Sequence, residues 1–363
     1  MTQPLQRVLI MAGGTGGHVF PALAVAKAFQ EKGAEIRWLG TRSGIESRIV
    51  PENGIELVYL DVAGVRGQGI KRLLMAPLKI VSAIWQVLRL IRNFKPDLVL
   101  GMGGFVTGPG GIGAWLSRTP LCIHEQNAVA GFTNRVLARF AKRVFEAFPG
   151  TFPELARKVV TTGNPVRTEI AEIADPELRL REREGPIHVL ILGGSQGAVA
   201  LNDLVPQAFA AMDEPGQFMI RHQAGGKNHE AASKKYQAFG VKAEVLPFID
   251  DMQAAYAWAD IVICRSGALT VAELAAAGVG SLLVPYPFAV DDHQTRNGDY
   301  LASRGAAILI QQKDLEPNML KRVITEKLSD RAELLRMAKA ARSLALVEAT
   351  RQVVEGCEEV VHG

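Results

Sequence analysis

Short runs of apolar and β-branched residues alternate with longer segments of helical periodicity along the first half of the chain. The runs at 8–11, 35–39, 57–60, 97–100, 121–124 and 143–146 predict buried strands, and helices are predicted from near Pro21 to residue 31, around 45–50 and over 78–94. Strands separated by helices are typical of a parallel sheet in a doubly wound α/β domain. Ligands of such domains bind at the carboxyl ends of the strands.

The same pattern restarts at residue 188, which indicates an internal structural repeat. A strand at 188–192, a glycine turn at 193–197 and a helix through residue 209 echo residues 7–29. Further strands are predicted at 217–222, 243–247, 261–264, 281–284 and 307–310, and one long helical tail over 333–361. We therefore expect two Rossmann-like domains that face each other across a cleft, with a linker at 162–167. Their predicted extents are 1–164, joined by the C-terminal helix at about 345–363, and 165–344.

The first glycine-rich loop follows the first predicted strand directly. Gly13, Gly14, Gly16 and Gly17 precede a helix that is predicted to begin near Pro21, and such a helix start attracts anions. A dinucleotide-binding motif fits poorly, because its last glycine would fall on Val19 and the second strand ends in Gly40 instead of an acidic residue. The loop therefore predicts a phosphate site and not a dinucleotide site.

Composition narrows the classes of partner. The 363 residues suffice for two domains, and the net charge of +4 with no alternation of aromatic and basic residues gives no reason to expect nucleic acid.

Cys122, Cys264 and Cys357 are too widely spaced for a disulfide framework or a metal set, and are expected to be buried thiols in a reducing cytoplasm. The uncharged window at 98–117 contains seven glycines and Pro109, which favour a strand and a second glycine-rich loop over a membrane span.

A second candidate phosphate site follows the strand at 261–264. Backbone N–H groups of Ser266 and of 268–270 would face a diphosphate at the start of the next helix, and Glu273 could accept two hydrogen bonds from ribose hydroxyls. The alternative is structural, since Thr270 and Glu273 have the spacing of a capping box. The acidic and basic stretch at 177–184 is expected to be a solvated face.

The loop at 284–297 is dense in polar groups and suits a hydroxyl-rich ligand such as a sugar. Asp291, Asp292 and His293 could alternatively hold a metal ion, although adjacent carboxylates on a loop rarely both ligate one ion. A metal site is therefore the less favoured interpretation.

Two places at the first sheet's edge offer a general base. His18 is predicted to lie directly before the first helix, whose positive end would keep the imidazole neutral and able to accept a proton, although a bound diphosphate would act in the opposite direction. His124, Glu125 and Asn127 end another strand at the same edge and compete with it. An isolated histidine can also simply cap or pack a helix.

Residues 62–96 contain no acidic side chain and combine seven basic residues with apolar ones. The basic residues are Arg66, Lys71, Arg72, Lys79, Arg89, Arg92 and Lys95, and the interleaved apolar ones are Leu73, Leu74, Met75, Leu78, Trp85 and Leu88. Such a surface suits an anionic membrane interface. An ordinary helix packed on its sheet through Ile80, Ile84, Val87 and Ile91 explains the apolar residues equally well, and one helix can do both.

Six blocks of sequence closely resemble the MurG family, bacterial N-acetylglucosaminyltransferases of glycosyltransferase family 28. They are GGTGGHVFPALA (13–24), GGFVTGPGG (103–111), HEQNAVAGFTNR (124–135), TGNPVR (162–167), GGSQGA (193–198) and SGALTVAEL (266–274). The resemblance implies a GT-B fold and an inverting enzyme that transfers GlcNAc from UDP-GlcNAc to the C4 hydroxyl of MurNAc in undecaprenyl-diphospho-MurNAc-pentapeptide, lipid I. The product would be lipid II, for peptidoglycan synthesis.

The resemblance also implies roles for individual residues. His18 would be the catalytic base, with Glu125 as the alternative, and no cofactor or bound metal is implied, although a divalent cation could stimulate the reaction. Gly13, Gly14, Gly103 and Gly104 would hold the acceptor diphosphate. UDP-GlcNAc would contact Thr15, Gly16, Gly17, Asn127, Arg167, Ser195, Ile249, Ala268, Leu269, Thr270, Val271, Ala272, Glu273 and Gln294.

Partners and location follow from the same resemblance. We expect lipid I, UDP-GlcNAc, an anionic membrane surface contacted through 66–95 and other cell-wall synthesis proteins as partners, and a peripheral position on the cytoplasmic face of the bacterial inner membrane. The alternatives are another GT-B enzyme, such as a UDP-GlcNAc 2-epimerase, and a non-catalytic UDP-sugar sensor. An epimerase needs no acceptor, and a sensor would bind the donor without turnover.

Overall fold

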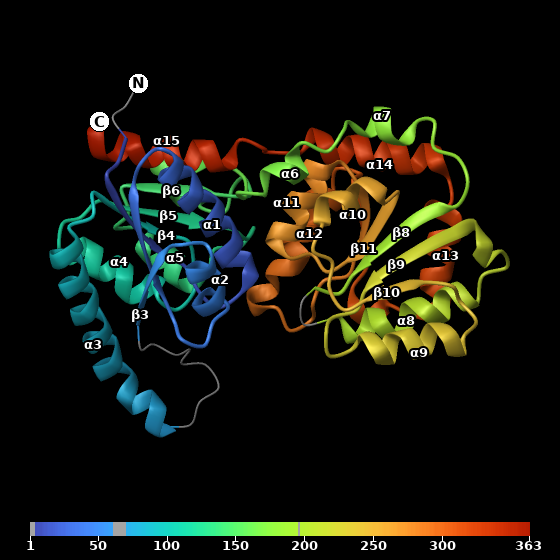
Figure 1. Ribbon diagram of the computed structural model, residues 1–363, viewed down its shortest axis with the longest axis horizontal. Helices are drawn as coiled ribbons and strands as arrows, with labels where there is room; N and C mark the ends of the chain where they lie inside the picture. The colour runs from blue at the N-terminus through green and yellow to red at the C-terminus, as the bar shows by residue number, and fades with distance from the viewer. Residues whose placement is uncertain (1–3, 61–69, 195–196) are drawn as a thin grey trace. The chain divides into compact units, whose positions relative to one another are not determined.

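The structure, a computed structural model, describes residues 4–60, 70–194 and 197–363, and gives backbone only for 70–77. The chain divides into two compact units (Figure 1). Unit 1 comprises Met1–Val166 and Val347–Gly363, and unit 2 comprises Arg167–Leu346. The predicted boundaries after residue 164 and near residue 345 lie close to these divisions.

Unit 1 is built on a seven-stranded sheet in the order β3-β2-β1-β4-β5-β6-β7, in which every pair is parallel. The strands are β1 Arg7–Met11, β2 Glu35–Gly40, β3 Glu56–Tyr59, β4 Leu98–Gly101, β5 Leu121–Glu125, β6 Arg143–Glu146 and β7 Val159–Thr161. The first six confirm the prediction. The pattern does not predict β7, because three residues are too few to establish a period.

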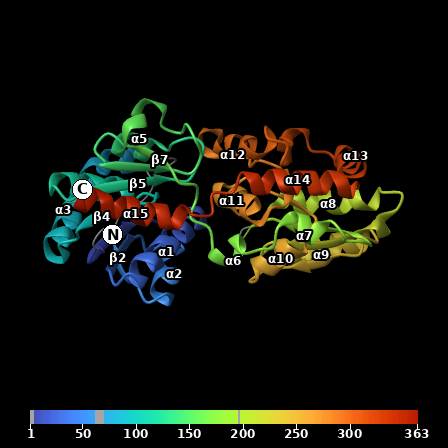
Figure 2. The ribbon, with the colours of Figure 1, turned by 90° about the horizontal axis from the view of Figure 1, so that it is seen from above.

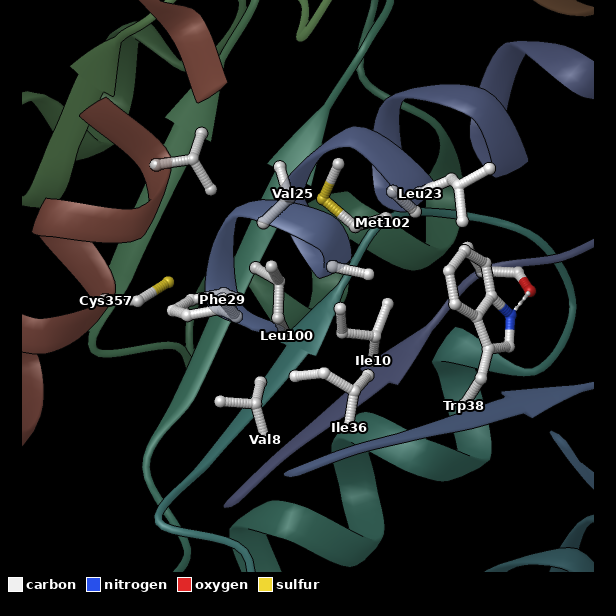
Figure 3. Close-up of a cluster of buried hydrophobic side chains, with 14 of the residues drawn as sticks. Val8, Ile10, Leu23, Val25, Phe29, Ile36, Trp38, Leu100, Met102 and Cys357 are labelled. Carbon is white, nitrogen blue, oxygen red and sulfur yellow. Dashed lines mark hydrogen bonds between the residues drawn. The ribbon is translucent and has the colours of Figure 1, made fainter. Parts of the chain in front are cut away.

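Both faces of this sheet are covered, which explains why its strands are almost uniformly apolar. Val8 and Ile10 of β1 point to a core shared with α1 (Gly16–Glu31) and α15 (Ala349–His362), while Leu9 and Met11 point to one shared with α3 (Ile70–Phe94) and α4 (Thr107–Leu116). Figure 3 shows the first core, where the buried Trp38 indole donates to the carbonyl of Ala12 at 2.8 Å. The remaining helices of unit 1 are α2 Glu46–Glu52, α5 Phe132–Leu137 and the 3-10 helix Pro153–Lys158.

The first helix begins earlier than predicted. It starts at Gly16, with Thr15 as its extended N-cap, so Pro21 lies inside the helix and costs one backbone hydrogen bond there. Consequently His18 lies in the first helical turn and not before the helix. The predicted C-terminal tail is likewise two helices, α14 (Arg331–Ser343) and α15, separated by residues 344–348.

The C-terminal helix α15 returns to unit 1 and packs on α1 and β6 (Figure 2). Lys32 of α1 pairs with Glu358 of α15 at 2.7 Å, and Arg143 of β6 pairs with Glu359. Cys122 and Cys357 lie in this region, and all three cysteines of the chain are free and buried, as predicted. In 98–117 the predicted strand is β4, but most of the predicted glycine-rich loop is helical and forms α4. None of the helices in the described ranges has the length and apolar character needed to cross a membrane.

Unit 2 is built on a six-stranded parallel sheet in the order β10-β9-β8-β11-β12-β13. Its strands are β8 Ile187–Leu192, β9 Phe218–Gln223, β10 Glu244–Leu246, β11 Ile261–Cys264, β12 Gly280–Leu283 and β13 Ala307–Leu309. Its helices, besides α14, are α6 Thr168–Ala171, α7 Pro176–Leu180, α8 Val199–Ala210, α9 His229–Ala238, α10 Met252–Trp258, α11 Ala268–Ala277, α12 His293–Ala302 and α13 Pro317–Lys327. The helix α8 after the glycine turn confirms the predicted repeat of the β1–α1 pattern.

The charged stretch at 177–184 is only in part the solvated face that the sequence predicts, with Leu178, Arg181, Glu182 and Glu184 exposed. Leu180 is buried, and Arg179 donates to the carbonyl of Ala277 at 3.1 Å at the carboxyl end of α11. Arg183 donates to the carbonyl of Trp258 and to the Asp260 carboxylate at 2.7 and 2.8 Å. Burial lowers the pKa of Arg179 to about 10. These side chains donate to carbonyls at helix ends that have no partner within the helix. The pattern of apolar and polar residues in the sequence does not show which carbonyls need such donors.

A neutral polar network lies within unit 2 at the end of β9. The His222 ring lies 3.0 Å from the hydroxyl of Tyr236 and 3.0 Å from the amide oxygen of Asn202, and Asn202 in turn donates to the carbonyl of Ala224. Every polar group of the ring is thus satisfied in its uncharged form. Burial lowers the pKa of His222 to about 3, and burial likewise lowers the pKa of His124 in unit 1 to about 4.

These two histidines predict acid sensitivity. Because their folded pKa lies below the unfolded value of about 6.5, the unfolded chain binds more protons below that pH, and stability is lost as the pH falls. We expect each to cost about 2 kcal/mol of unfolding free energy between pH 7 and pH 5. Urea unfolding at both pH values checks this, with His222→Asn expected to reduce the loss in unit 2. An unchanged pH dependence in that variant contradicts the assignment.

Candidate active site

Two glycine loops of unit 1 meet at the carboxyl edge of its sheet, after β1 and after β4. Gly103 and Gly104 both have a positive φ, of 100° and 90°. A Cβ atom on Gly104 would overlap the backbone of Gly13, and one on Gly103 would lie 2.5 Å from Cδ2 of His18. The predicted pairing of the two loops is therefore confirmed, and glycine is required at 103 and 104 by both conformation and space.

His18 lies against this junction, in the first turn of α1. Its Nδ1 is 3.3 Å from the carbonyl oxygen of Gly13. A carbonyl can only accept, so this contact assigns the proton of the neutral ring to Nδ1 and the basic lone pair to Nε2. The half-buried ring is thus arranged to take a proton at Nε2.

The fully buried carboxylate of Glu46 forms a hydrogen bond with the first glycine loop. Glu46, the first residue of α2, accepts from the N–H of Gly14 at 3.0 Å and from the N–H and hydroxyl of Thr41 at 2.9 and 2.7 Å. Cβ atoms on Gly13, Gly40 or Gly44 would collide with this side chain. The N–H of Gly14 is therefore occupied by Glu46 and does not face a phosphate, while the role of Gly13, Gly103 and Gly104 in acceptor binding stays a prediction.

Glu125, the alternative base, is already engaged within its own loop. Its buried carboxylate accepts from the N–H and side-chain amide of Asn127 and from the N–H of Gly131 and the amide of Asn134, at 2.8–3.1 Å. Its neighbour His124 is buried, and its Nε2 lies 2.9 Å from the carbonyl of Gly163. These contacts assign both residues to loop structure and leave His18 as the better candidate. Asn127 lies beside Glu125, where a sugar contact stays a prediction.

In unit 2 the predicted diphosphate site is the start of α11, after β11. The helix begins at Ala268 with Gly267 as its N-cap, so Thr270 is the third helical residue and cannot form the capping box with Glu273. The structural alternative is therefore wrong. Ser266, which precedes the helix, is fully buried, and its hydroxyl has no hydrogen-bond partner among the described residues. Such an orphan group in a helix start is typical of a ligand site.

Glu273 lies one turn into α11 with one partner on each carboxylate oxygen. Arg167 donates to Oε1 and the Tyr256 hydroxyl donates to Oε2, both at 3.1 Å. Burial raises the pKa of Glu273, and Arg167 and Tyr256 oppose that shift. Tyr256 of α10 is itself fully buried, whereas the Arg167 side chain is 44% exposed. Tyr256 is thus a fixed partner, and Arg167 is the one that a ligand can displace.

The other predicted residues lie on neighbouring loops of unit 2. Ile249 is buried after β10, and Gln294 of α12 accepts from the N–H of Tyr286 at 2.9 Å. Asp291 and Asp292 form a turn with positive φ, in which Asp292 accepts from Thr295 at 2.7 Å. Ser195 lies outside the described residues, and the residues described include no group of three or more potential metal-ligating His, Cys, Asp or Glu side chains.

The basic and apolar segment at 66–95 is described from α3 onward. Val87 and Ile91 are buried as expected, whereas Ile80 is exposed, and Leu78, Val81 and Trp85 are exposed by 60% or more. Trp115 and Leu116 at the end of α4 are half exposed as well, and the Trp115 ring contacts that of Phe140 in a tilted arrangement with centroids 5.0 Å apart. We call the exposed side chains Leu78, Val81, Trp85, Trp115 and Leu116 the apolar patch.

Two site residues escape prediction from the sequence, Glu46 and Tyr256. The glycines at 40 and 44 beside Glu46 are the only local signal for the first, and they make room for its carboxylate. Nothing in the sequence near Tyr256 links it to Glu273, because their contact joins two helices. A hollow of about 750 Å³ between the starts of β9 and β10 includes none of the predicted residues.

Comparison with known proteins identifies the family. The glycosyltransferase family 28 N-terminal domain matches residues 8–146, and the family 28 C-terminal domain matches 188–353. The UDP-N-acetylglucosamine--N-acetylmuramyl-(pentapeptide) pyrophosphoryl-undecaprenol N-acetylglucosamine transferase of Nitrosococcus oceani is 53% identical, over 98% of this chain and 99% of its own.

Solved structures agree. The crystal structure of Acinetobacter baumannii MurG has a TM-score of 0.85 and 43% identity, over 98% of this chain and 99% of its own. A Neisseria meningitidis UDP-GlcNAc 2-epimerase, at 15% identity and a TM-score of 0.65 over 97% and 99% of the two chains, shares the fold alone. With two parallel α/β units of the GT-B type, the chain belongs to glycosyltransferase family 28 and, within it, to the MurG enzymes.

Proposed function

We propose that this glycosyltransferase moves GlcNAc from UDP-GlcNAc to the C4 hydroxyl of MurNAc in lipid I and so forms lipid II. The observation that carries the proposal is the junction of the two glycine loops in unit 1, where His18 lies with its basic nitrogen assigned to Nε2. The 53% identical transferase, matched over nearly its whole length, supports the choice of substrates.

The reaction is a single displacement that inverts the donor carbon. His18 Nε2 takes the proton of the acceptor hydroxyl, the oxygen bonds to C1 of GlcNAc, and the bond from C1 to the diphosphate breaks with its electron pair leaving on UDP. The transition state resembles an oxocarbenium ion. His18 thus removes the proton at the moment when the hydroxyl becomes a nucleophile.

UDP leaves with negative charge that unit 2 is equipped to stabilise. The N–H groups at the start of α11 and the guanidinium of Arg167 both favour an anion. Glu273 would bind the ribose hydroxyls once Arg167 turns from it to the diphosphate. These groups supply positive potential without a bound metal, so we expect a divalent cation to be stimulatory at most.

The reaction is tested by incubation with UDP-GlcNAc, with and without a lipid I analogue. We expect lipid-linked disaccharide only when both are present, and we expect His18→Gln to lower kcat by about 100-fold or more, because general base catalysis contributes that much. Calorimetry provides the control, since donor affinity should be unchanged. Epimerised donor without acceptor would indicate an epimerase, and donor binding with no product would indicate a sensor.

Tyr256→Phe tests the donor site in unit 2. Without the hydroxyl, the Glu273 carboxylate loses one hydrogen bond and can rotate. We therefore expect KM for UDP-GlcNAc to rise about tenfold, which corresponds to the free energy of one hydrogen bond to a charged group, with little change in kcat. Tyr300→Phe is the matched control, because it removes a hydroxyl that donates to the carbonyl of Leu344 at 3.3 Å. A donor KM that is equal in both variants contradicts the role of Glu273 at the ribose.

We further infer that the apolar patch binds an anionic membrane surface, which places the enzyme peripherally on the cytoplasmic face of the bacterial inner membrane. Exposed aromatic and aliphatic side chains of the patch can enter the lipid interface, and the same helix α3 carries the exposed basic residues Lys79, Arg89 and Arg92. Arg89 lies over the Trp85 ring at 4.8 Å. The acceptor is a lipid, so membrane binding would bring the enzyme to its substrate.

Vesicle sedimentation checks the membrane surface. We expect the double variant Val81→Ser with Trp85→Ser to lose about tenfold in partitioning to vesicles with anionic lipid, because two apolar contacts are removed. Met219→Ser with Phe239→Ser removes similarly exposed apolar side chains from unit 2 and should leave binding unchanged. Equal losses in both variants would show that the apolar patch is not the binding surface.

A further inference from the structure

One peptide group connects Glu46 with His18. The carbonyl oxygen of Gly13 and the N–H of Gly14 belong to the same planar amide. The carbonyl faces Nδ1 of His18 at 3.3 Å, and the N–H donates to Oε2 of Glu46 at 3.0 Å. Carboxylate, amide and imidazole therefore form a continuous chain of hydrogen bonds.

This chain has a defined direction of polarisation. A carboxylate that accepts a hydrogen bond from an amide N–H polarises the peptide group, and this increases the negative charge on the carbonyl oxygen of the same amide. That oxygen then binds the Nδ1–H of His18 more strongly. The effect favours the tautomer with a basic Nε2, and it stabilises the imidazolium that forms when Nε2 takes a proton.

Burial of the Glu46 carboxylate costs free energy, and nearby glycines leave the space that it occupies. Its carboxylate is fully buried, and its three hydrogen-bond donors, from Gly14 and Thr41, are neutral. Burying a charge without a cation costs stability, and these three hydrogen bonds offset part of that cost. Glycine at 13, 40 and 44 leaves the space that this side chain fills.

We propose that Glu46 is a positioning residue for the transfer reaction, which acts on His18 through the Gly13–Gly14 peptide. The inference deepens the proposed function and rests on it, since it assumes that His18 is the base. Glu46 touches neither substrate nor reacting atoms in this account. Its effect is on the orientation, tautomer and charge of the imidazole.

Unit 1 supplies a matched control in Glu146. This carboxylate is also buried and accepts from two backbone N–H groups and one threonine hydroxyl, those of Gly150, Phe152 and Thr161, at 3.0, 3.1 and 2.8 Å. It lies at the end of β6, where its contacts hold a different loop. Glu146→Gln thus has the same chemical change and a similar structural cost without the connection to His18.

The experiment compares Glu46→Gln with Glu146→Gln in the full-length enzyme, and uses two measurements. Steady-state kinetics should show kcat reduced about tenfold to a hundredfold in Glu46→Gln, with an unchanged KM for UDP-GlcNAc, and near wild-type kcat in Glu146→Gln. Long-range ¹H–¹⁵N spectra of the histidine rings, without substrate, should show the Nδ1–H tautomer of His18 in the wild type and a mixture of tautomers in Glu46→Gln. His18→Gln assigns the signal.

The outcomes separate this inference from the proposed function. Wild-type kcat or an unchanged His18 tautomer in Glu46→Gln would overturn the role of Glu46, as would an equal loss of kcat in Glu146→Gln. If the wild type forms no disaccharide, the proposed function fails, and the tautomer spectra still decide whether Glu46 controls His18. Should Glu46→Gln not fold, Glu46→Asp, whose carboxylate is too short to reach Gly14, should give the same mixture of tautomers.

Discussion

The loops at the carboxyl edge of the unit 1 sheet carry backbone N–H groups that the sheet cannot pair, and buried carboxylates satisfy them. Glu46, Glu125 and Glu146 each accept three or more hydrogen bonds, and at least two of these come from loops that follow β1, β2, β5 or β6. An unpaired buried N–H costs about 1–3 kcal/mol, so one carboxylate that pairs several holds its loop firmly. The position of the His18 ring depends on this constraint, because Gly13 and Gly103 are the surfaces against which it lies.

The repeated β–glycine turn–α pattern of unit 2 is held by different chemistry. A Cβ atom on Gly193 would lie 2.9 Å from the carbonyl oxygen of Gln223, and one on Gly197 would overlap that of Ala224. The same Ala224 carbonyl accepts from Asn202, which belongs to the neutral network of His222. The glycine turn of unit 1 is thus held by the carboxylate of Glu46, whereas carbonyls and a neutral ring lie beside that of unit 2.

The sequence predicts the strands, the repeat and the glycine loops well, because alternation of apolar runs and helices is a local property. Features that depend on contacts between helices and strands are not predicted from the sequence. The start of α1 is misplaced since Gly16 and Gly17 adopt helical conformation despite low propensity, and Arg179 is half-buried because the end of α11 needs donors. Glu46 and Tyr256 become visible only once packing places them against Gly14 and Glu273. The resemblance to a family assigns no role to either of these two residues.

In the proposed reaction one displacement, with His18 as base, joins GlcNAc to the muramoyl C4 oxygen. The anomeric configuration and linkage position of the purified disaccharide product, measured by NMR, test this most directly. We predict a β-linkage to C4 from the α-configured donor, since a single displacement inverts the carbon. An α-linkage, or attachment at another hydroxyl, would contradict the proposed reaction.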